Sequence, residues 1–524
     1  MNYLKQHFKT STMRLVLFMT FTSVSLSLSA QDMIINESEQ TFDDLSFSEN
    51  QRLSRIQAKA MYTNYHLVKF GSLAEMQQDG KITIRLPESD CEDLVYKAKS
   101  VEYRNEQDYT WYGTLESKVE DEECYCRLGS ITLISSEFGR IGHISVDDKT
   151  YELLELSEDV FVVSKLDGSK FTEEECGVND KTPKYKSKED QSASTRDNGN
   201  CDVRCLVLFT NSALNAEGDL AAINNRINLA IAQTNRALRN SDVDRCQLRI
   251  ELAGVEPYNL NPDPFTGLPQ GESNSIFNDI NSLAMDNASQ ALRDGADADI
   301  VILLTDAVEN GGNYGGVFGI VEAIGPNNNT SYAIVETGAA TTGRFTFAHE
   351  VAHLFGGGHN TDPRPGIPHG HNFKTGNFLP CIFGKRQRTI LNTAGANDVR
   401  IQHYSNPNVK FDDKKTGKDN ERDNAQQLRG EACVVAQFRE TVEPFSVVIG
   451  GERFGCPCQG ASITSTIFGG TAGATYTYDW FVSNDGINFT SLPYNGSSAL
   501  ANLPCTEGDG VFYESRSGWI GWEY

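Results

Sequence analysis

Short apolar runs that alternate with polar residues dominate the chain between 31 and 178. Such alternation, with a period of two, is typical of half-exposed β-strands. The clearest runs begin at Lys81, Ile131, His143 and Val160. We therefore expect a mostly β unit over this region.

From 201 to 443 the pattern changes to apolar strands that alternate with amphipathic helices. The strands are expected at 205–210, 247–255, 298–305 and 331–337. The helices are expected at 219–240, near 276–294 and near 422–440. This alternation is typical of an α/β layer, so we expect a mixed, mainly parallel sheet.

After Pro444 the alternating pattern returns, most clearly at Tyr476, Tyr478, Trp480 and Val482. Short alternating strands that are separated by turn residues favour a β-sandwich over 444–524. Little chain follows the last of these runs, so we expect an incomplete module.

Residues 179–200 contain almost no large apolar side chain and cannot bury a core. We expect this segment to be an exposed linker in which a precursor is processed, for example after Arg196.

The first thirty residues are expected to be a signal peptide. Lys5, Lys9 and Arg14 precede an apolar stretch that ends in small residues at Ala30. A buried N-terminal helix is the alternative. No later stretch reaches eighteen apolar residues, so we expect an exported, soluble product without a transmembrane segment.

The net charge indicates which partners are disfavoured, and the cysteine content indicates the redox compartment. Lysine and arginine total 46 against 71 acidic residues, a formal charge of −25. This charge disfavours nucleic acid and anionic membranes as partners. In an exported chain the 12 cysteines indicate several disulfides. Spacing does not fix their pairing, and Cys381 with Cys433 is one guess. Two C-x-C pairs lack the second pair of a zinc site: Cys124/Cys126 and Cys456/Cys458.

The segment FAHEVAHLFGGGHN at 347–360 carries the strongest chemistry in the chain. His349 and His353 are four residues apart, so a helix places both imidazoles on one face. A sharp turn at Gly356 brings His359 back as a third ligand. Three imidazoles leave a fourth zinc position for water, as a catalytic zinc site requires.

The spacing is specific. A bare H-E-x-x-H arises by chance in roughly 1% of chains of this composition, and adding Gly356 and His359 reduces that to about one in 10⁵. A helix with ordinary satisfied histidines and a structural zinc are the alternatives. Glu350 favours catalysis, because it can serve as general base to the water and then as general acid to the leaving amine.

The motif H349-E-V-A-H353-L-F-G356-G-G-H359 resembles the metzincin zinc signature, and about 201–440 is similar to reprolysin-type (adamalysin-like) secreted bacterial proteases. The segments YSNP at 404–407 and DNA at 423–425 add to this resemblance. It implies a metzincin-like catalytic domain that holds one zinc ion. No residue pattern indicates a structural calcium site.

By the same resemblance, the glycine-rich stretch at 313–321 would be the edge strand that pairs with an extended substrate. Gly316, Val317, Phe318 and Gly319 would carry that contact. From the residues alone, an exposed loop and an edge strand are equally compatible with this stretch.

Two residues depart from the family pattern. Metzincins carry a methionine in a tight turn beneath the zinc, but the last methionine here is Met285. The matching segment 388–395 places Leu391 there, which is close in volume. Asn360 follows the third histidine, where reprolysins usually have Asp, and it still offers hydrogen bonds.

Cys176-Gly177-Val178 resembles the cysteine switch of reprolysin propeptides, in which a thiolate occupies the open zinc position. A disulfide from Cys176 to an earlier cysteine is the alternative. His369, His371 and His403 are interpreted as loop or pocket-wall residues rather than ligands.

The sequence therefore predicts a secreted, latent zinc metalloendopeptidase that cuts internal bonds of proteins. Its expected regions are a signal peptide (1–30), propeptide (31–178), linker (179–200), catalytic domain (201–443) and C-terminal module (444–524) that resembles PKD or immunoglobulin-like domains. That module is a candidate for surface or carbohydrate contact, and we expect a monomer.

A degenerate metzincin that acts as a secreted binding or adhesion protein is one alternative, although a binding protein has no need of Glu350. A gluzincin with a distant Glu ligand is the other, disfavoured by the His359 spacing.

Overall fold

The computed structural model describes 41–69, 80–84, 86, 94–103, 108–116, 128–158, 160–167, 201–243, 248–258, 275–306, 314–325, 327–362, 369–375, 386–393 and 398–439. It gives the backbone alone for strands at 33–37, 177–178, 446–451, 463–468, 477–483, 490–491, 499–500 and 512–518. The expected signal peptide, the expected linker and Cys381 lie outside these residues.

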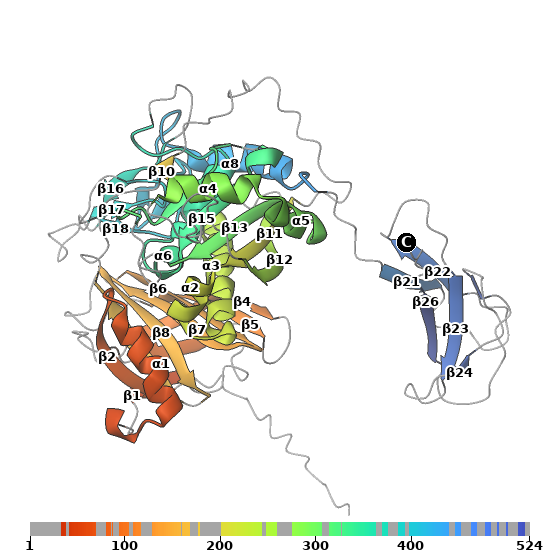
Figure 1. Cartoon of the computed structure of the whole chain (residues 1–524), viewed down its shortest axis with the longest axis horizontal. Helices are drawn as coiled ribbons and strands as arrows, with labels where there is room; N and C mark the ends of the chain where they lie inside the picture. The colour runs from red at the N-terminus through yellow and green to blue at the C-terminus, as the bar shows by residue number, and fades with distance from the viewer. Residues whose placement is uncertain are drawn as a thin grey trace, which may run out of the picture.

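The N-terminal region forms a closed β-barrel, drawn in red to orange in Figure 1. Its strands pair in the order β1-β2-β9-β8-β7-β6-β5-β4-β3, antiparallel except for β1 with β3. Trp111, Tyr96 and Phe161 are fully buried in its core. The strands are β1 (Met33–Glu37), β2 (Tyr62–Lys69), β3 (Lys81–Ile84), β4 (Leu94–Tyr103), β5 (Tyr109–Leu115), β6 (Gly129–Ser136), β7 (Gly139–Val146), β8 (Lys149–Ser157) and β9 (Val160–Leu166).

A helix outside the barrel was not predicted from the sequence. After the short 3₁₀ turn η1 (Phe42–Asp44), α1 (Phe47–Ala58) begins at Ser46, whose side chain accepts from the Glu49 backbone N–H in a capping box. Its apolar face is narrow, which explains why periodicity did not reveal it.

The central region contains the expected mixed sheet, in the order β10-β14-β15-β13-β11-β12. Neighbouring strands are parallel except for β14, which is antiparallel to β15. The strands are β10 (Gly177–Val178), β11 (Asp202–Phe209), β12 (Arg249–Pro257), β13 (Ile300–Thr305), β14 (Gly319–Val321) and β15 (Tyr332–Glu336). The runs β13 and β15 are buried on both faces, as a parallel sheet between helices requires.

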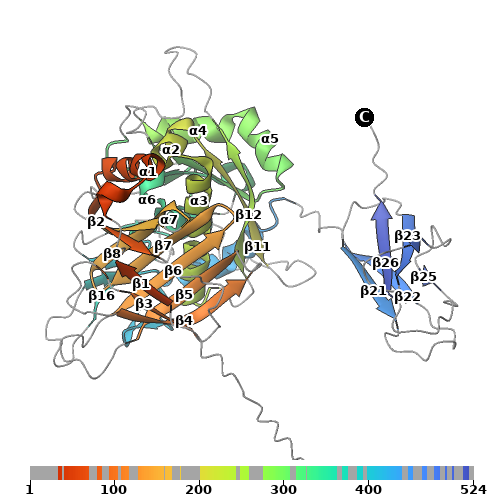
Figure 2. The same cartoon turned by 90° about the horizontal axis from the view of Figure 1, so that it is seen from below.

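Helices cover both faces of this sheet (Figures 1 and 2). Val203, Val207 and Phe209 face a core shared with α3, α7 and α8, whereas Leu206 and Leu208 face α4. The helices are α2 (Asn211–Glu217), α3 (Leu220–Asn240), α4 (Ile276–Met285), α5 (Asn287–Gly295), α6 (Thr337–Ala340), α7 (Thr346–Leu354) and α8 (Asn424–Val435).

The stretch expected to be helical near 276–294 forms two helices, because the chain turns to an extended conformation at Asp286. The last helix is shorter than predicted and ends at Val435. Short elements complete the domain: η8 (Asn328–Thr330), β16 (Asn372–Lys374), β17 (Arg386–Arg388), β18 (Val399–Arg400), β19 (Lys410–Phe411) and β20 (Lys414–Lys415).

The guess that Cys381 pairs with Cys433 is wrong, because Cys433 forms a disulfide with Cys201. This bond joins the start of β11 to α8 across 232 residues of sequence. The local sequence around two cysteines so far apart carries no sign that they pair, so the pairing could not be predicted. Cys205, also in β11, is a buried thiol.

The C-terminal strands form two three-stranded sheets, β21-β22-β25 and β24-β23-β26. Their bounds are β21 (Ser446–Gly451), β22 (Ile463–Phe468), β23 (Thr477–Ser483), β24 (Thr490–Ser491), β25 (Ala499–Leu500) and β26 (Phe512–Gly518). Their assignment to a PKD or immunoglobulin-like type stays a prediction. Within the described part of the chain, no helix is both long and apolar enough to cross a membrane.

Candidate metal centre

Three histidine side chains meet at one buried point beside the central sheet. His349 and His353 come from successive turns of α7, and His359 comes from the segment that follows. Their Nε2 atoms lie 2.9 Å (His349 to His359), 3.0 Å (His349 to His353) and 2.9 Å (His353 to His359) apart. Elsewhere among the described residues, no His, Cys, Asp or Glu side chains converge in this way.

Backbone carbonyls fix the tautomers of two of these rings. His349 Nδ1 donates to the Ile390 carbonyl at 2.9 Å, and His353 Nδ1 donates to the Gly357 carbonyl at 2.8 Å. A carbonyl only accepts, so each Nδ1 carries the proton and each Nε2 carries a lone pair. Two lone pairs at this separation repel unless a cation lies between them. The residues present therefore fit a metal ion.

The electrostatic surroundings keep His349 neutral. Burial, and then the neighbouring rings of His353 and His359, hold the pKa of His349 well below its ordinary value of 6.5. Neutral imidazole is the form that binds a metal. Three nitrogen ligands with a position left for water are typical of catalytic zinc.

A glycine ends the helix and returns the chain to the metal. Gly356 has φ +84°, a conformation that a residue with a Cβ seldom adopts, and its N–H donates to the His353 carbonyl at 2.9 Å. The expected sharp turn is present, and it brings His359 beside the two helical histidines.

Leu391 lies in a buried tight turn, directly after Ile390, whose carbonyl accepts from the His349 ring. The turn closes with the Asn392 N–H donating to the Thr389 carbonyl at 2.9 Å. A Cβ built on Gly357 would lie 2.5 Å from Leu391 Cδ1, so the leucine packs directly on the segment between His353 and His359. This is the position that the resemblance gives to methionine.

Asn360 ties this turn to the metal-binding segment. Its Oδ1 accepts from both the backbone N–H and the hydroxyl of Thr393, each at 2.8 Å. These acceptor roles need no charge, so Asn serves where the family usually has Asp.

Two motifs that the sequence offered only as signs of family resemblance brace the site. The Tyr404 hydroxyl donates to the Ala348 carbonyl at 2.8 Å, and the Asn424 side chain exchanges two hydrogen bonds of 3.2 Å with the Gly358 backbone. Ser405 joins the two motifs by accepting from the Asn424 N–H at 2.9 Å. Their roles were missed because the partners are distant in sequence.

Glu350 is fully buried on α7, between two of the ligands in sequence. Its carboxylate lies against β14: a Cβ built on Gly319 would be 2.4 Å from Glu350 Oε1 and 2.8 Å from Thr346 Cγ2. Only a residue without a side chain fits at 319. The glycine therefore lets the edge of the sheet approach the carboxylate closely.

Only one of the four residues expected in the edge strand lies within β14, which begins at Gly319. Gly316 has φ +88° and belongs to a turn, in which the Val317 N–H donates to the Tyr314 carbonyl at 3.3 Å. Phe318 extends the ladder by one hydrogen bond, its carbonyl accepting from Glu336 N–H at 2.8 Å. The positive-φ glycines preceding the strand explain why it is shorter than expected.

Cys176 lies outside the described residues, but the two residues after it form β10. Gly177 pairs with Ile320 and Val178 with Val321, parallel to β14. The backbone of Gly177–Val178 therefore covers the edge of the strand next to Glu350.

The other central histidines are not part of the metal centre. His369 bridges its backbone to Gly358, and His371 and His403 lie apart from the three ligands. Burial lowers the pKa of His371 to about 4 and that of His403 to about 3, so both are neutral at pH 7.

Comparisons with known proteins agree with this geometry. The pattern of the reprolysin-like metallopeptidases of family M12B matches residues 224–360. A peptidyl-Asp metalloendopeptidase of Stenotrophomonas maltophilia strain K279a is 26% identical over 350 residues, which is 63% of this chain and 76% of the relative. Its namesake from Xanthomonas campestris pv. campestris is 25% identical over 351 residues, with the same coverage.

The matched region, residues 224–360, is reprolysin-like and contains the three converging histidines. A solved chain described as a chaperone–substrate complex aligns at a TM-score of 0.34 and 15% identity, over 59% of this chain and 41% of that one. That likeness is too weak to carry an argument. The triad of His349, His353 and His359 is typical of a metzincin catalytic zinc site, and the activity is that of a reprolysin-like zinc metalloendopeptidase.

Proposed function

We propose that this metalloendopeptidase uses Glu350 as its general base and acid and is made as a latent, exported precursor. The observation that carries the catalytic part is the position of Glu350, buried on α7 beside two of the zinc ligands and against Gly319. When bound, zinc supplies a Lewis acid that polarises the scissile carbonyl and makes water more acidic. Glu350 takes the proton of the attacking water and delivers it to the leaving amine.

The variant Glu350→Gln tests this role, because it keeps the shape of the side chain and removes its basicity. We expect a fall in kcat on the order of 10²–10⁴, with one zinc still bound and an unchanged thermal midpoint. Zinc content by atomic absorption separates this result from loss of the metal. A variant that binds zinc and keeps wild-type turnover contradicts the role of Glu350.

A preference for aspartate beside the cleaved bond is the substrate specificity that we propose, after the names of the curated relatives. Arg400 supports it, since its positive charge acts on His349 and lowers the pKa of that ring after the two neighbouring histidines. Its guanidinium also donates to the Arg344 carbonyl at 2.5 Å, which holds it in place. A fixed arginine favours an acidic side chain of the substrate over its neutral amide.

Paired peptides that differ only by Asp, Asn or Ala at one position test this preference. In Arg400→Gln we expect kcat/KM for the Asp peptide to fall by about tenfold or more, while the Ala peptide changes little. Arg400→Lys is the matched control, which keeps the charge and loses the planar geometry. Equal rates for Asp and Asn peptides in the wild-type enzyme contradict the proposal.

Latency is supported by the pairing of β10 with β14, because this pairing covers the edge along which an extended substrate would add. A Cys176 thiolate in the open zinc position would complete the block. In Cys176→Ser, the unprocessed chain should gain activity. Titration of thiols in the precursor distinguishes this switch from the alternative, a disulfide between Cys176 and an earlier cysteine; a precursor as inactive as the wild type contradicts it.

Export from the cytoplasm is supported by the Cys201–Cys433 disulfide, since such bonds persist in oxidising compartments. Detection of the processed protein in culture medium, with cleavage near Ala30, tests export directly.

A further inference from the structure

The N-terminal barrel and the catalytic domain share one apolar core along α3. The barrel has its own interior, built around Trp111. A second cluster outside that interior contains barrel residues such as Tyr112 and Ile134 together with Leu229 and Ala232 of α3. The exposed fraction of Leu229 is 0%. Without the barrel, these apolar side chains of α3 would be exposed to solvent.

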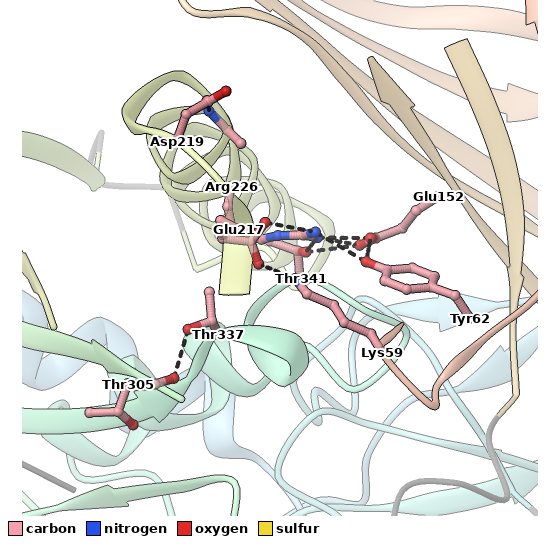
Figure 3. Close-up of polar contacts among 10 residues, drawn as sticks. Lys59, Tyr62, Glu152, Glu217, Asp219, Arg226, Thr305, Thr337 and Thr341 are labelled. Carbon is pink, nitrogen blue, oxygen red and sulfur yellow. Dashed lines mark hydrogen bonds and ion pairs between the residues drawn. The ribbon is translucent and has the colours of Figure 1, made fainter. Parts of the chain in front are cut away.

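A buried cluster of charges crosses the same interface (Figure 3). Arg226 of α3 is 1% exposed, and its Nη1 donates to both carboxylate oxygens of Glu152 in β8, at 2.7 and 2.8 Å. Its Nη2 donates to the Tyr62 hydroxyl of β2 at 3.1 Å. On the catalytic side, Glu217 lies 3.4 Å from the guanidinium and forms a second ion pair, at 2.6 Å, with Lys59 of the barrel region.

This cluster is well satisfied only while both parts are present. Burial opposes the charge on Arg226, but Glu152 and Glu217 outweigh it and hold the pKa of the guanidinium above its ordinary value. If the barrel left, Arg226 would lose Glu152 and Tyr62, and Glu217 would lose Lys59. Replacing one partner while the others stay buried, as in Glu152→Gln, leaves an uncompensated charge at the interface and is strongly destabilising.

The barrel also touches the connection that leads into the active-site helix. The Thr341 hydroxyl lies between Arg226 (2.6 Å) and Glu152 (2.9 Å). A Cβ built on Gly343 would lie 3.1 Å from the Thr150 hydroxyl oxygen. The ring of Phe345, the residue before α7, packs edge-on against His143 with centroids 5.4 Å apart. These residues immediately precede the helix that carries His349 and Glu350.

We propose that the barrel is a permanent companion of the catalytic domain, which stays bound after the linker is cut and holds the start of α7 in place. The shared core, the buried cluster around Arg226 and the contacts to 341–345 are the three parts of this interface. The inference rests on the proposed processing of the linker. Its test is physical association, so it is independent of whether Glu350 or Arg400 acts as proposed.

The experiment uses the full chain with a site-specific protease sequence placed within 181–196. After complete cutting, we expect the two fragments to elute together in size-exclusion chromatography at micromolar concentration and in 1 M salt. Glu152→Gln should weaken the association of the fragments by about a hundredfold or more, as expected for loss of one partner of a buried pair. The variant should also lower the thermal midpoint of the nicked protein.

Glu102→Gln is the matched control, because Glu102 joins the same barrel to Arg239 of α3 at 2.9 Å, but in a solvent-exposed pair. Exposed pairs contribute little, so association should change by less than about fivefold. Separation of the wild-type fragments after cutting overturns the proposal, and it does so even if Glu152→Gln fails to fold. Equal weakening by the two substitutions overturns the part assigned to Arg226.

Discussion

Gly319 shows how one missing side chain shapes the active site. Its Cα lies so close to Glu350 that a Cβ would reach within 2.4 Å of the carboxylate. Thr346, on the first turn of the same helix, would also be contacted. The sheet edge and the Glu350 carboxylate therefore lie in direct contact.

Gly319→Ala should displace the Glu350 carboxylate and lower kcat/KM by a factor of ten to a hundred. The nearest atoms to that Cβ belong to Glu350 and Thr346 rather than to the three histidines, which should still hold one zinc ion. Peptide hydrolysis and zinc content, measured together, check this. Gly295→Ala is the control, because a Cβ there has nothing within 4 Å. Full activity of Gly319→Ala would show that the carboxylate does not need this position.

Single residues were predicted well where their chemistry depends on short sequence spacing. His349, His353 and His359 met as expected, since a helical turn and one glycine determine their positions. Leu391 packs against Gly357, between His353 and His359 in sequence, and its assignment to the methionine position stays a prediction. Asn424 was not assigned a role, because its partner Gly358 is 66 residues away and no local pattern records that contact.

At the scale of elements, long apolar runs gave β11, β13, β15 and α3 nearly at their observed limits. Strands that are buried on both faces have an unbroken run of apolar residues, so the sequence shows them clearly. The edge strand β14 was placed too early, because turn glycines and strand residues share one apolar, glycine-rich stretch. The short helix α1 was missed altogether.

The Cys201–Cys433 disulfide fastens β11 to α8 and closes a very long loop. Replacing both residues, as Cys201→Ser with Cys433→Ser, should lower the free energy of unfolding by about 2–4 kcal/mol. Thermal unfolding with and without reductant measures the effect. Reductant should lower the midpoint of the wild type by more than that of the double variant, because any other disulfides of the chain are reduced in both proteins. A wild-type midpoint insensitive to reduction, with both thiols titratable afterwards, would contradict this stabilising role.

At the scale of the whole molecule, the barrel makes the structure sensitive to acid. Burial lowers the pKa of His143 to about 4, while Glu152 raises it and Arg226 lowers it. No described group accepts from or donates to its Nε2. The unfolded chain binds a proton near the ordinary pKa of 6.5, so stability is present at neutral pH and falls as pH drops from about 6.5 to 4.

Between pH 7 and pH 5, this histidine should contribute a loss of about 2 kcal/mol. His143→Phe removes the titrating group and keeps an aromatic ring against Phe345. Thermal midpoints of the two proteins should therefore differ in their pH dependence, the variant losing less on acidification. Comparing the two cancels zinc release, which both share. Parallel pH profiles would mean that His143 does not titrate in this range.

The most direct test of the whole account is the zinc dependence of peptide hydrolysis by the processed protein. Hydrolysis of an internally quenched peptide should stop when a chelator removes zinc, and it should return when one equivalent of zinc per chain is restored. The result follows from a single site formed by three buried imidazoles. Hydrolysis that persists in zinc-free protein, or one bound zinc ion with no hydrolysis, would contradict the assignment as a zinc metalloendopeptidase.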